Sequence, residues 1–264
     1  IDVWAANFES KVPIYIEATW GRSSSFSILG SARPGSYFSN FSGAPDASLW
    51  YPSALANALA GKDLDGDNPE MIITVNSLAS WYRGGGSGPS KSEYDLQSVF
   101  LHEMGHGLGF LSTDSYDQFF GYGTIEQPTP YDAYAQLADG RRLSDLPSPS
   151  IELGKALTST LVWAGPLGIA ANGGVKPKIY TPNRYESGSS VSHLDEATFA
   201  GAGINSVMSP SLDAGEVFRE PGSLLLGMME DMRNKPPAGI AVGLPTAVRN
   251  LQVLIGDSSA IITF

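Results

Sequence analysis

Apolar and polar positions follow patterns along the chain that predict short strands and helices. Residues 12–20 alternate apolar and polar side chains, which predicts a half-buried strand, and residues 71–76 predict a second strand. Residues 50–60 have helical periodicity, and Pro52 suits the first turn of a helix. This mixture of strands and helices indicates an α+β fold.

The second half of the chain carries weaker patterns. The long segment between His106 and His193 must contain structure of its own, because a plain loop of that length is uncommon in a compact domain. Within that segment we predict helices at residues 132–137 and 151–161 and a short strand at residues 177–180. Beyond it we predict a helix at residues 224–232.

The last part of the chain, residues 241–264, differs from the main domain, which we place at residues 1–240. Two runs, residues 247–254 and 259–264, predict strands joined by a turn. The pair resembles the first two strands of a fibronectin type III module, which would make this segment the start of a truncated module. The alternative is a β-hairpin that packs back on the main domain.

Composition and charge argue against two classes of partner. The chain has 264 residues, of which 42% are hydrophobic and 16% charged, as is typical of a folded globular protein. Its net charge of −11 argues against binding to nucleic acid or to an anionic membrane, because both attract clustered Lys and Arg. We expect a monomer with protein or peptide partners, and its carboxylates are available for calcium.

The absence of cysteine and the identity of the first residue limit the possible metal ligands and suggest removal of a targeting segment. The chain has no cysteine, so disulfides and thiolate metal ligands are ruled out. No apolar run reaches the length of a membrane span. The chain begins at Ile1 rather than Met, and we expect a mature form from which a targeting segment has been removed.

The most informative stretch is the motif H-E-x-x-H, which runs from His102 to His106. If this stretch is helical, four residues complete just over one turn, so both imidazoles project from one face and can bind a single metal ion. Glu103 lies beside that face, where a carboxylate can take a proton from a metal-bound water. This arrangement is typical of zinc peptidases.

Residues around the motif support a functional helix. Ser92 and Asp95 form an S-x-x-D start signal ahead of an apolar helical face. Three glycines would be costly in a helix that served only as scaffold. Gly105 and Gly107 suggest close backbone packing, and Gly109 suggests a left-handed residue that ends the helix.

A catalytic zinc site needs a third protein ligand and one position left for water. His193, in the sequence S-H-L-D-E, is the remaining histidine of the three in the chain, and N-S-V-M-S-P follows at residues 205–210. With H-E-x-x-H, these motifs resemble the metzincin-type zinc endopeptidases. The usual metzincin signature would place the third histidine at Ser112. A long insertion before that histidine is similar to the leishmanolysin-type arrangement, and the three motifs together resemble a group of secreted bacterial peptidases.

The resemblance covers roughly residues 4–235 and implies roles for the matching residues. The implied zinc ligands are His102, His106 and His193. Glu103 would be the general base and would later protonate the leaving amine. Met208 would lie beneath the metal as a packed residue that does not bind it, and Gly109 would allow the turn into the lower subdomain.

The implied fold has two subdomains, and the implied protein is a secreted, extracellular zinc metalloendopeptidase of a bacterium. The upper subdomain, about residues 1–110, would hold a mixed twisted sheet and the active-site helix. The lower subdomain, about residues 111–240, would be irregular and helical. A substrate strand would pair with a sheet edge, for which residues 71–76 are the candidate.

Two features near the implied site stay open. Some metzincins have a Tyr two residues after the methionine, where this chain has Pro210, so the residue that stabilises the oxyanion is not assigned. Asp195 and Glu196 could orient His193, serve calcium, or be solvated loop charges.

An acidic loop at Asp63, Asp65 and Asp67 resembles a calcium-binding loop, with alternating carboxylates around Gly66. It lacks the Glu that closes a full EF-hand loop at its twelfth position, which here is Thr74. The alternative is a solvated Asp/Gly turn.

Two other functional hypotheses remain at this stage. In an aspzincin or gluzincin, a carboxylate would replace His193 as third ligand, the candidates being Asp114, Asp117 and Glu126. In a secreted binding or adhesion module the metal would be inert or structural, although such a site has no need of Glu103.

Overall fold

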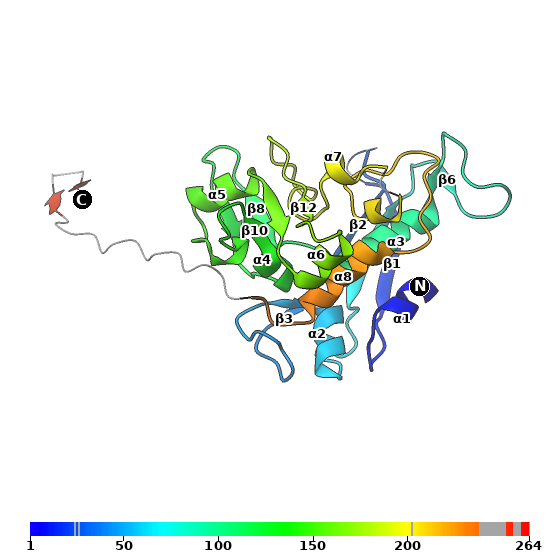
Figure 1. Cartoon of the computed structure of the whole chain (residues 1–264), viewed down its shortest axis with the longest axis horizontal. Coiled ribbons are helices and arrows are strands. Elements are labelled where there is room, and N and C mark those ends of the chain that lie inside the picture. The colour runs from blue at the N-terminus through cyan, green and yellow to red at the C-terminus, as the bar shows by residue number, and fades with distance from the viewer. Residues whose placement is uncertain (24, 26, 202, 238–251, 256–259, 264) are drawn as a thin grey trace.

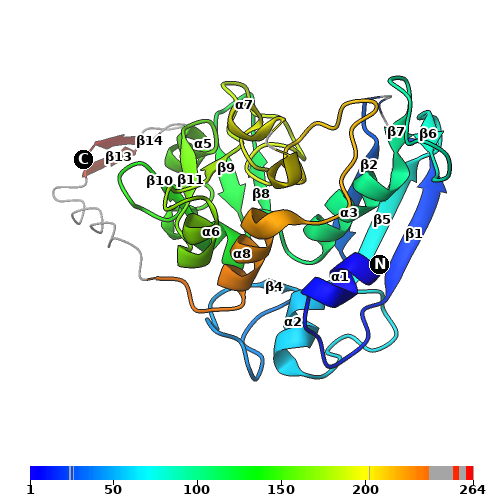
Figure 2. The ribbon, with the colours of Figure 1, turned by 45° about the vertical axis from the view of Figure 1, so that its right-hand side comes forward.

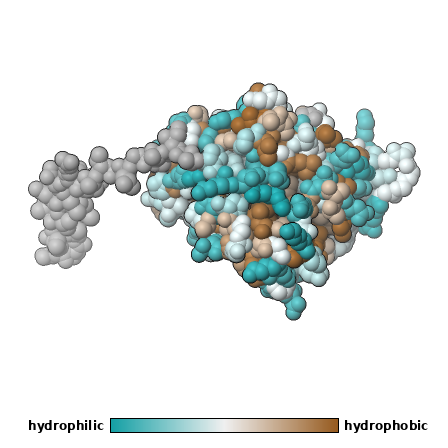
Figure 3. Space-filling model, turned by 60° about the horizontal axis from the view of Figure 1, so that its bottom comes forward, coloured by the Kyte–Doolittle hydropathy of each residue, from teal (hydrophilic) through white to brown (hydrophobic). Residues whose placement is uncertain are grey.

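The computed structural model describes residues 1–23, 25, 27–201, 203–237, 252–255 and 260–263, and helices and short strands alternate along them (Figure 1). This confirms the predicted α+β class. None of the helices in the described ranges has the length and apolarity needed to cross a bilayer. The face turned forward in Figure 3 mixes hydrophilic and hydrophobic residues, as globular protein surfaces do.

The largest sheet of the N-terminal half is mixed and has the order β1-β5-β2. β5 (Met71–Asn76) runs parallel to β1 (Ile16–Gly21) and antiparallel to β2 (Gly30–Pro34). The prediction that residues 71–76 form a sheet edge is therefore wrong. Alternate apolar residues of β5 are buried and both its sides are hydrogen-bonded, so β2 and β1 form the edges.

The motif lies on α3 (Leu96–Gly107), as its spacing predicts. Asp95, not Ser92, is the N-cap, since its carboxylate accepts a hydrogen bond from the Ser98 backbone N–H. Arg219 donates to both oxygens of the same carboxylate. The beginning of α3 is thereby tied to a segment more than a hundred residues further along the chain.

α3 packs closely on the sheet, beside β2 and β5 (Figure 2). A Cβ at Gly107 would lie 2.8 Å from the Met71 Cβ, so only glycine permits this approach. Gly109 has a φ of +124°, a conformation that favours glycine, and the chain leaves the helix there. Both glycine predictions are confirmed.

Short elements complete the N-terminal part. They are α1 (Asp2–Asn7), β3 (Tyr37–Phe38), β4 (Tyr51–Pro52), α2 (Ser53–Ala60), β6 (Trp81–Tyr82) and β7 (Tyr94–Asp95). Trp4 of α1 is buried and its indole N–H donates to the Leu101 carbonyl, which attaches the N-terminus to α3.

The chain from residue 111 to 237 forms a second group of elements, drawn green to orange in Figures 1 and 2. They are β8 (Asp114–Tyr116), β9 (Gly123–Ile125), α4 (Pro130–Tyr134), β10 (Ala135–Leu137), η1 (Leu143–Asp145), α5 (Ile151–Leu157), β11 (Leu161–Trp163), α6 (Pro166–Ala171), β12 (Lys178–Ile179), α7 (Glu196–Phe199), η2 (Gly203–Ser206) and α8 (Gly222–Met232). The predicted helices at 132–137 and 151–161 extend too far toward the C-terminus. α4 ends at Tyr134, directly before β10, and α5 ends at Leu157, before β11 begins at Leu161. The short strand and the helix at 224–232 are confirmed.

At the C-terminal end, β13 (Gln252–Ile255) and β14 (Ala260–Thr263) pair antiparallel, as the two predicted strands require. The predicted turn between them lies outside the described residues. Both interpretations of this segment, a truncated module and a packed hairpin, stay predictions.

We predict that Asp95→Ala lowers the free energy of unfolding by about 1–3 kcal/mol, because the helix loses its N-cap and Arg219 loses its carboxylate. Asp95→Asn should cost less, because its amide oxygen can still cap α3. Chemical denaturation of the three proteins at neutral pH measures both effects.

Acidification provides the control. Burial raises the pKa of Asp95, but hydrogen bonds from Arg219 and Ser98 outweigh it and hold the pKa below its ordinary value. A depressed pKa stabilises the fold above the unfolded-state pKa of about 3.9 and loses that contribution as pH falls through the folded pKa. The gap between wild type and Asp95→Asn should shrink on acidification; a gap that widens would contradict this account.

Candidate metal centre

Three histidines from two distant segments meet at one point. α3 supplies His102 and His106, and the loop between β12 and α7 supplies His193. The Nε2 atom of His106 lies 3.0 Å from that of His102 and 3.2 Å from that of His193, and the His102–His193 pair is also 3.2 Å apart. The third histidine predicted from the sequence therefore joins the other two.

The hydrogen bonds of the three Nδ1 atoms show which nitrogen of each imidazole carries the hydrogen. Each Nδ1 lies within 2.7–2.8 Å of a backbone carbonyl oxygen, the partners of His102, His106 and His193 being Val207, Phe110 and Ser189. A carbonyl can only accept, so each Nδ1 carries the hydrogen and each Nε2 presents a lone pair. The three Nε2 atoms therefore cannot hydrogen-bond to one another.

Electrostatics keeps the three rings uncharged. Burial lowers the pKa of His102 and lowers the pKa of His193 to about 3. Burial, followed by the two neighbouring imidazoles, lowers the pKa of His106 well below its ordinary value. Neutral imidazoles are the protonation state that binds a metal.

A zinc ion fits this donor set. Four-coordinate zinc holds imidazole nitrogens at about 2.0–2.1 Å, which places them roughly 3.3 Å apart in a tetrahedron. The observed separations of 3.0–3.2 Å are close to that value. Three nitrogens without a protein carboxylate or thiolate leave one position for water, as in catalytic rather than structural zinc sites.

Glu103 faces the same cleft as the three histidines. Its side chain is 5% exposed, and burial raises the pKa of its carboxyl group to about 8. The backbone of β2 lies against it: a Cβ at Gly30 would come within 2.6 Å of Glu103 Oε1. Gly30 therefore provides the space that the carboxylate occupies, a contact that no sequence motif signalled.

Met208, to which the resemblance gave a place beneath the metal, packs against the α3 helix that carries His102 and His106. It is wholly buried, and a Cβ at Gly105 would be 2.8 Å from its sulfur. Its carbonyl accepts from the Leu194 N–H, and the preceding Val207 carbonyl faces His102. The segment after η2 therefore supports both His193 and α3 through backbone contacts.

The cleft has a volume of about 580 Å³. Its lining includes residues 27–32, which belong to β2 and the segment before it, together with Val207 and Pro210. Apolar side chains of Val99, Leu212 and Phe218 line one part of it.

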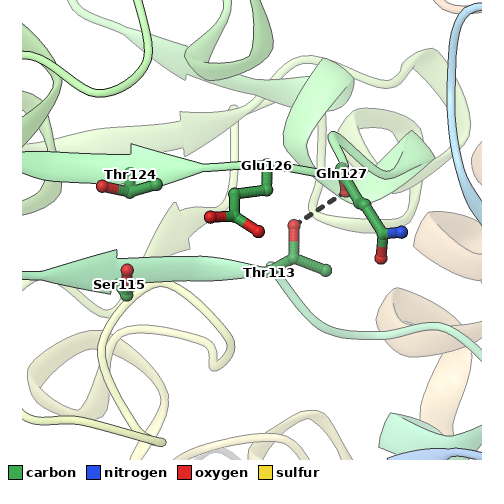
Figure 4. A pocket seen from close by; sticks show the side chains of 5 residues that line it. All are labelled: Thr113, Ser115, Thr124, Glu126 and Gln127. Atoms are coloured by element: carbon green, nitrogen blue, oxygen red, sulfur yellow. Dashed lines mark hydrogen bonds between the residues drawn. The ribbon is translucent and has the colours of Figure 1, made fainter.

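The carboxylates considered as alternative third ligands lie outside the histidine group. Asp114 is half-buried near Asp132, and the desolvation of its carboxyl group raises its pKa to about 7. Asp117 accepts hydrogen bonds from the backbone of the β8–β9 turn. Glu126 points into a separate polar hollow of about 310 Å³ formed with Thr113, Ser115, Thr124 and Gln127 (Figure 4).

Asp195 and Glu196 do not orient His193. Asp195 accepts from Thr198 at the start of α7, and it is the Ser189 carbonyl that contacts His193 Nδ1. At Ser112, the position of a short-signature third histidine, the backbone N–H instead donates a hydrogen bond to the Ser192 hydroxyl oxygen. That contact joins the segment after α3 to the His193 loop.

A second cluster of metal-ligand type involves the acidic loop. Asp63 and Asp65 are grouped with Glu70, whereas Asp67, which the sequence pattern favoured, lies outside the group. The alternating Asp residues of the sequence had predicted that Asp67 would be the third ligand, as in a calcium-binding loop. Bends at Asn68 and Glu70 lead into β5, and the Glu70 side chain is wholly buried.

No protein-family model, curated protein or solved structure matches this chain. Its function must therefore be inferred from its own side chains.

We predict that His193→Ala weakens zinc binding by more than about 100-fold, since even the loss of an outer-shell partner costs about 10–100-fold. Competition with a chromophoric chelator measures the affinity. Glu126→Ala is the matched control and should bind zinc like the wild type. Wild-type affinity in His193→Ala together with weakened binding in Glu126→Ala would restore the carboxylate-ligand hypothesis.

Proposed function

We propose that the protein is a metzincin-type, zinc-dependent endopeptidase in which Glu103 is the general base. The observation that carries the proposal is the convergence of three unprotonated Nε2 atoms within 3.0–3.2 Å of one another, in the cleft that Glu103 also lines. A binding module would need the ligands but has no use for a buried carboxylate beside them.

When bound, zinc lowers the pKa of a coordinated water and polarises the substrate carbonyl. His102, His106 and His193 hold the ion, and the carbonyls behind them fix the ring orientation. Glu103 accepts the proton of the attacking water and then delivers it to the leaving nitrogen. The low exposure of Glu103 suits this exchange, because little bulk water competes for the proton.

The substrate is an extended peptide. β2 is hydrogen-bonded on one side to β5, and residues from Gly30 to Ala32 line the cleft, so a peptide strand can pair with this edge. Main-chain pairing is insensitive to sequence, and selectivity then comes from side-chain pockets. Val99, Leu212 and Phe218 favour an apolar substrate residue beside the metal.

The division into an upper part, about residues 1–110, and a lower part, about residues 111–240, belongs to the same proposal. Residues lining the cleft come from both parts, with Glu103 in the first and His193 in the second. Met208, which follows His193 in the sequence as a Met-turn methionine does, is buried against Gly105 of α3, and this also supports the proposal. Secretion from a bacterium and a monomeric state remain expectations.

We predict that Glu103→Ala cleaves a labelled unfolded protein about 10²–10⁴-fold more slowly than the wild type at equal zinc content, because the general base is lost. The zinc content of both proteins is measured alongside the rate. Unchanged cleavage in Glu103→Ala would remove its assigned role. A fully zinc-loaded wild type that cleaves neither unfolded proteins nor peptide libraries would favour the binding module.

A second prediction concerns Gly30. A methyl group there must displace the Glu103 carboxylate, so Gly30→Ala should lower kcat by about tenfold or more, since small misplacements of catalytic groups cost up to about 10². Zinc affinity should be unchanged. Gly21→Ala on β1 is the control, because its Cβ would meet only an ordinary contact at 3.6 Å.

The double variant Gly30→Ala with Glu103→Asp tests the same contact. Aspartate is one methylene shorter, so the added methyl group has less to displace, and the effects of the two substitutions should not be additive. Additive losses in kcat would show that Gly30 acts elsewhere.

A further inference from the structure

A cluster of three carboxylates lies outside the cleft, where the loop after α2 leads into β5. One oxygen each of Asp63, Asp65 and Glu70 lies within 4.8 Å of the others. Glu70 immediately precedes Met71, the first residue of β5, and Asp63 lies three residues after the end of α2. The cluster therefore sits at a joint between a helix and the central strand.

Three negative groups are held together here without a positive charge. Glu70 is wholly buried, and among the described residues no Lys, Arg or His forms an ion pair with any of the three carboxylates. Burial raises the pKa of Asp65, and the Asp63 carboxylate raises it further. Burial likewise raises the pKa of Glu70, with smaller contributions from Asp65 and Asp63. Buried charges of one sign require a counter-charge or a proton.

One oxygen of the cluster has no partner. Asp65 Oδ2 is buried and accepts no hydrogen bond within the described part of the chain. Buried carboxylate oxygens are normally satisfied, and an orphan oxygen on a member of this acidic group points to a missing ligand. This observation is independent of the spacing of the acids in the sequence.

The surroundings hold the carboxylates in place. The Tyr15 N–H donates to Glu70 Oε2, and the Asn57 side-chain amide donates to Glu70 Oε1 at 3.0 Å. Asn57 is wholly buried and accepts from the Leu64 N–H, so its orientation is fixed by the loop itself. Glu70 and Met71 also donate backbone hydrogen bonds to the Tyr15 carbonyl. The site is thus built into the end of the sheet where β1 and β5 begin.

We propose that Asp63, Asp65 and Glu70 bind a structural calcium ion that clamps the α2–β5 loop to the β1 and β5 strands. All donors are oxygens, which suits a hard cation such as calcium better than zinc, whose sites usually include nitrogen or sulfur ligands. Asp63 is exposed, so water can complete the six to eight oxygens that calcium takes. Calcium accepts such an irregular set, whereas magnesium demands near-ideal octahedral geometry.

The test measures thermal unfolding of the zinc-loaded, calcium-stripped protein as CaCl₂ is added, with zinc kept at one equivalent. Saturating calcium should raise Tm by about 5–10 °C, since binding to the folded state alone stabilises it and a chain of this size shifts by about 2–4 °C per kcal/mol. Isothermal titration should give one calcium per chain, and MgCl₂ at the same concentration should give a smaller shift.

Variants assign the ligands. Asp65→Asn and Glu70→Gln should lose the calcium-dependent rise, and the exposed Asp63→Asn, which is expected to fold in any case, should bind calcium at least tenfold more weakly. Asp67→Asn is the matched control in the same loop and should keep the full response. Peptidase activity is not the readout, so the outcome is separate from the zinc chemistry.

Three results would overturn the proposal. The first is no rise in Tm with calcium in the wild type. The second is a full calcium-dependent rise that survives in both Asp65→Asn and Glu70→Gln. The third is a wild type that ignores calcium while Asp65→Asn or Glu70→Gln is more stable at neutral pH, because the cluster would then hold a proton instead of a cation.

Discussion

The constraint on which the rest of the site depends is the meeting of three unprotonated imidazole nitrogens. Their Nε2 lone pairs lie 3.0–3.2 Å apart, and each ring is fixed from behind by a backbone carbonyl. Such an arrangement is repulsive unless a cation lies between the nitrogens. The chain around them is organised to hold this geometry, and a neutral pocket of ordinary core histidines would not need it.

Close backbone packing makes the convergence possible. Gly105 admits the sulfur of Met208, Gly107 admits Met71, and Gly30 leaves room for the Glu103 carboxylate. In each case a Cβ would come within 2.6–2.8 Å of the neighbour. α3 can therefore lie against the sheet on one side and the Met208 segment on the other. The small residues allow the histidines of α3 and Glu103 to take their relative positions.

Long-range hydrogen bonds hold α3 at both ends. At its beginning, Asp95 and Ser98 bind Arg219 and Phe218, which come from the segment after Met208. Beyond its end, the Ser112 N–H contacts Ser192, the residue before His193. Both contacts join the histidine-bearing helix to the part of the chain that supplies the third ligand. The three histidines are thus held by long-range contacts at both ends of α3, whereas the proposed calcium site lies where β1 and β5 begin.

The sequence by itself determined the α3 helix, its two histidines and Glu103, because helical periodicity converts a spacing of four residues into a shared face. It also singled out His193, as the one histidine of the sequence left to be a third ligand, and Met208, through its likeness to a known motif. Tertiary structure decided which strand is the edge, since hydrogen bonding on both sides of β5 depends on where β1 and β2 pair. The tertiary structure also places Glu70, rather than Asp67, in the acidic cluster, and it places Gly30 against Glu103. These are contacts between segments that no local pattern encodes, because packing and long-range pairing bring them together.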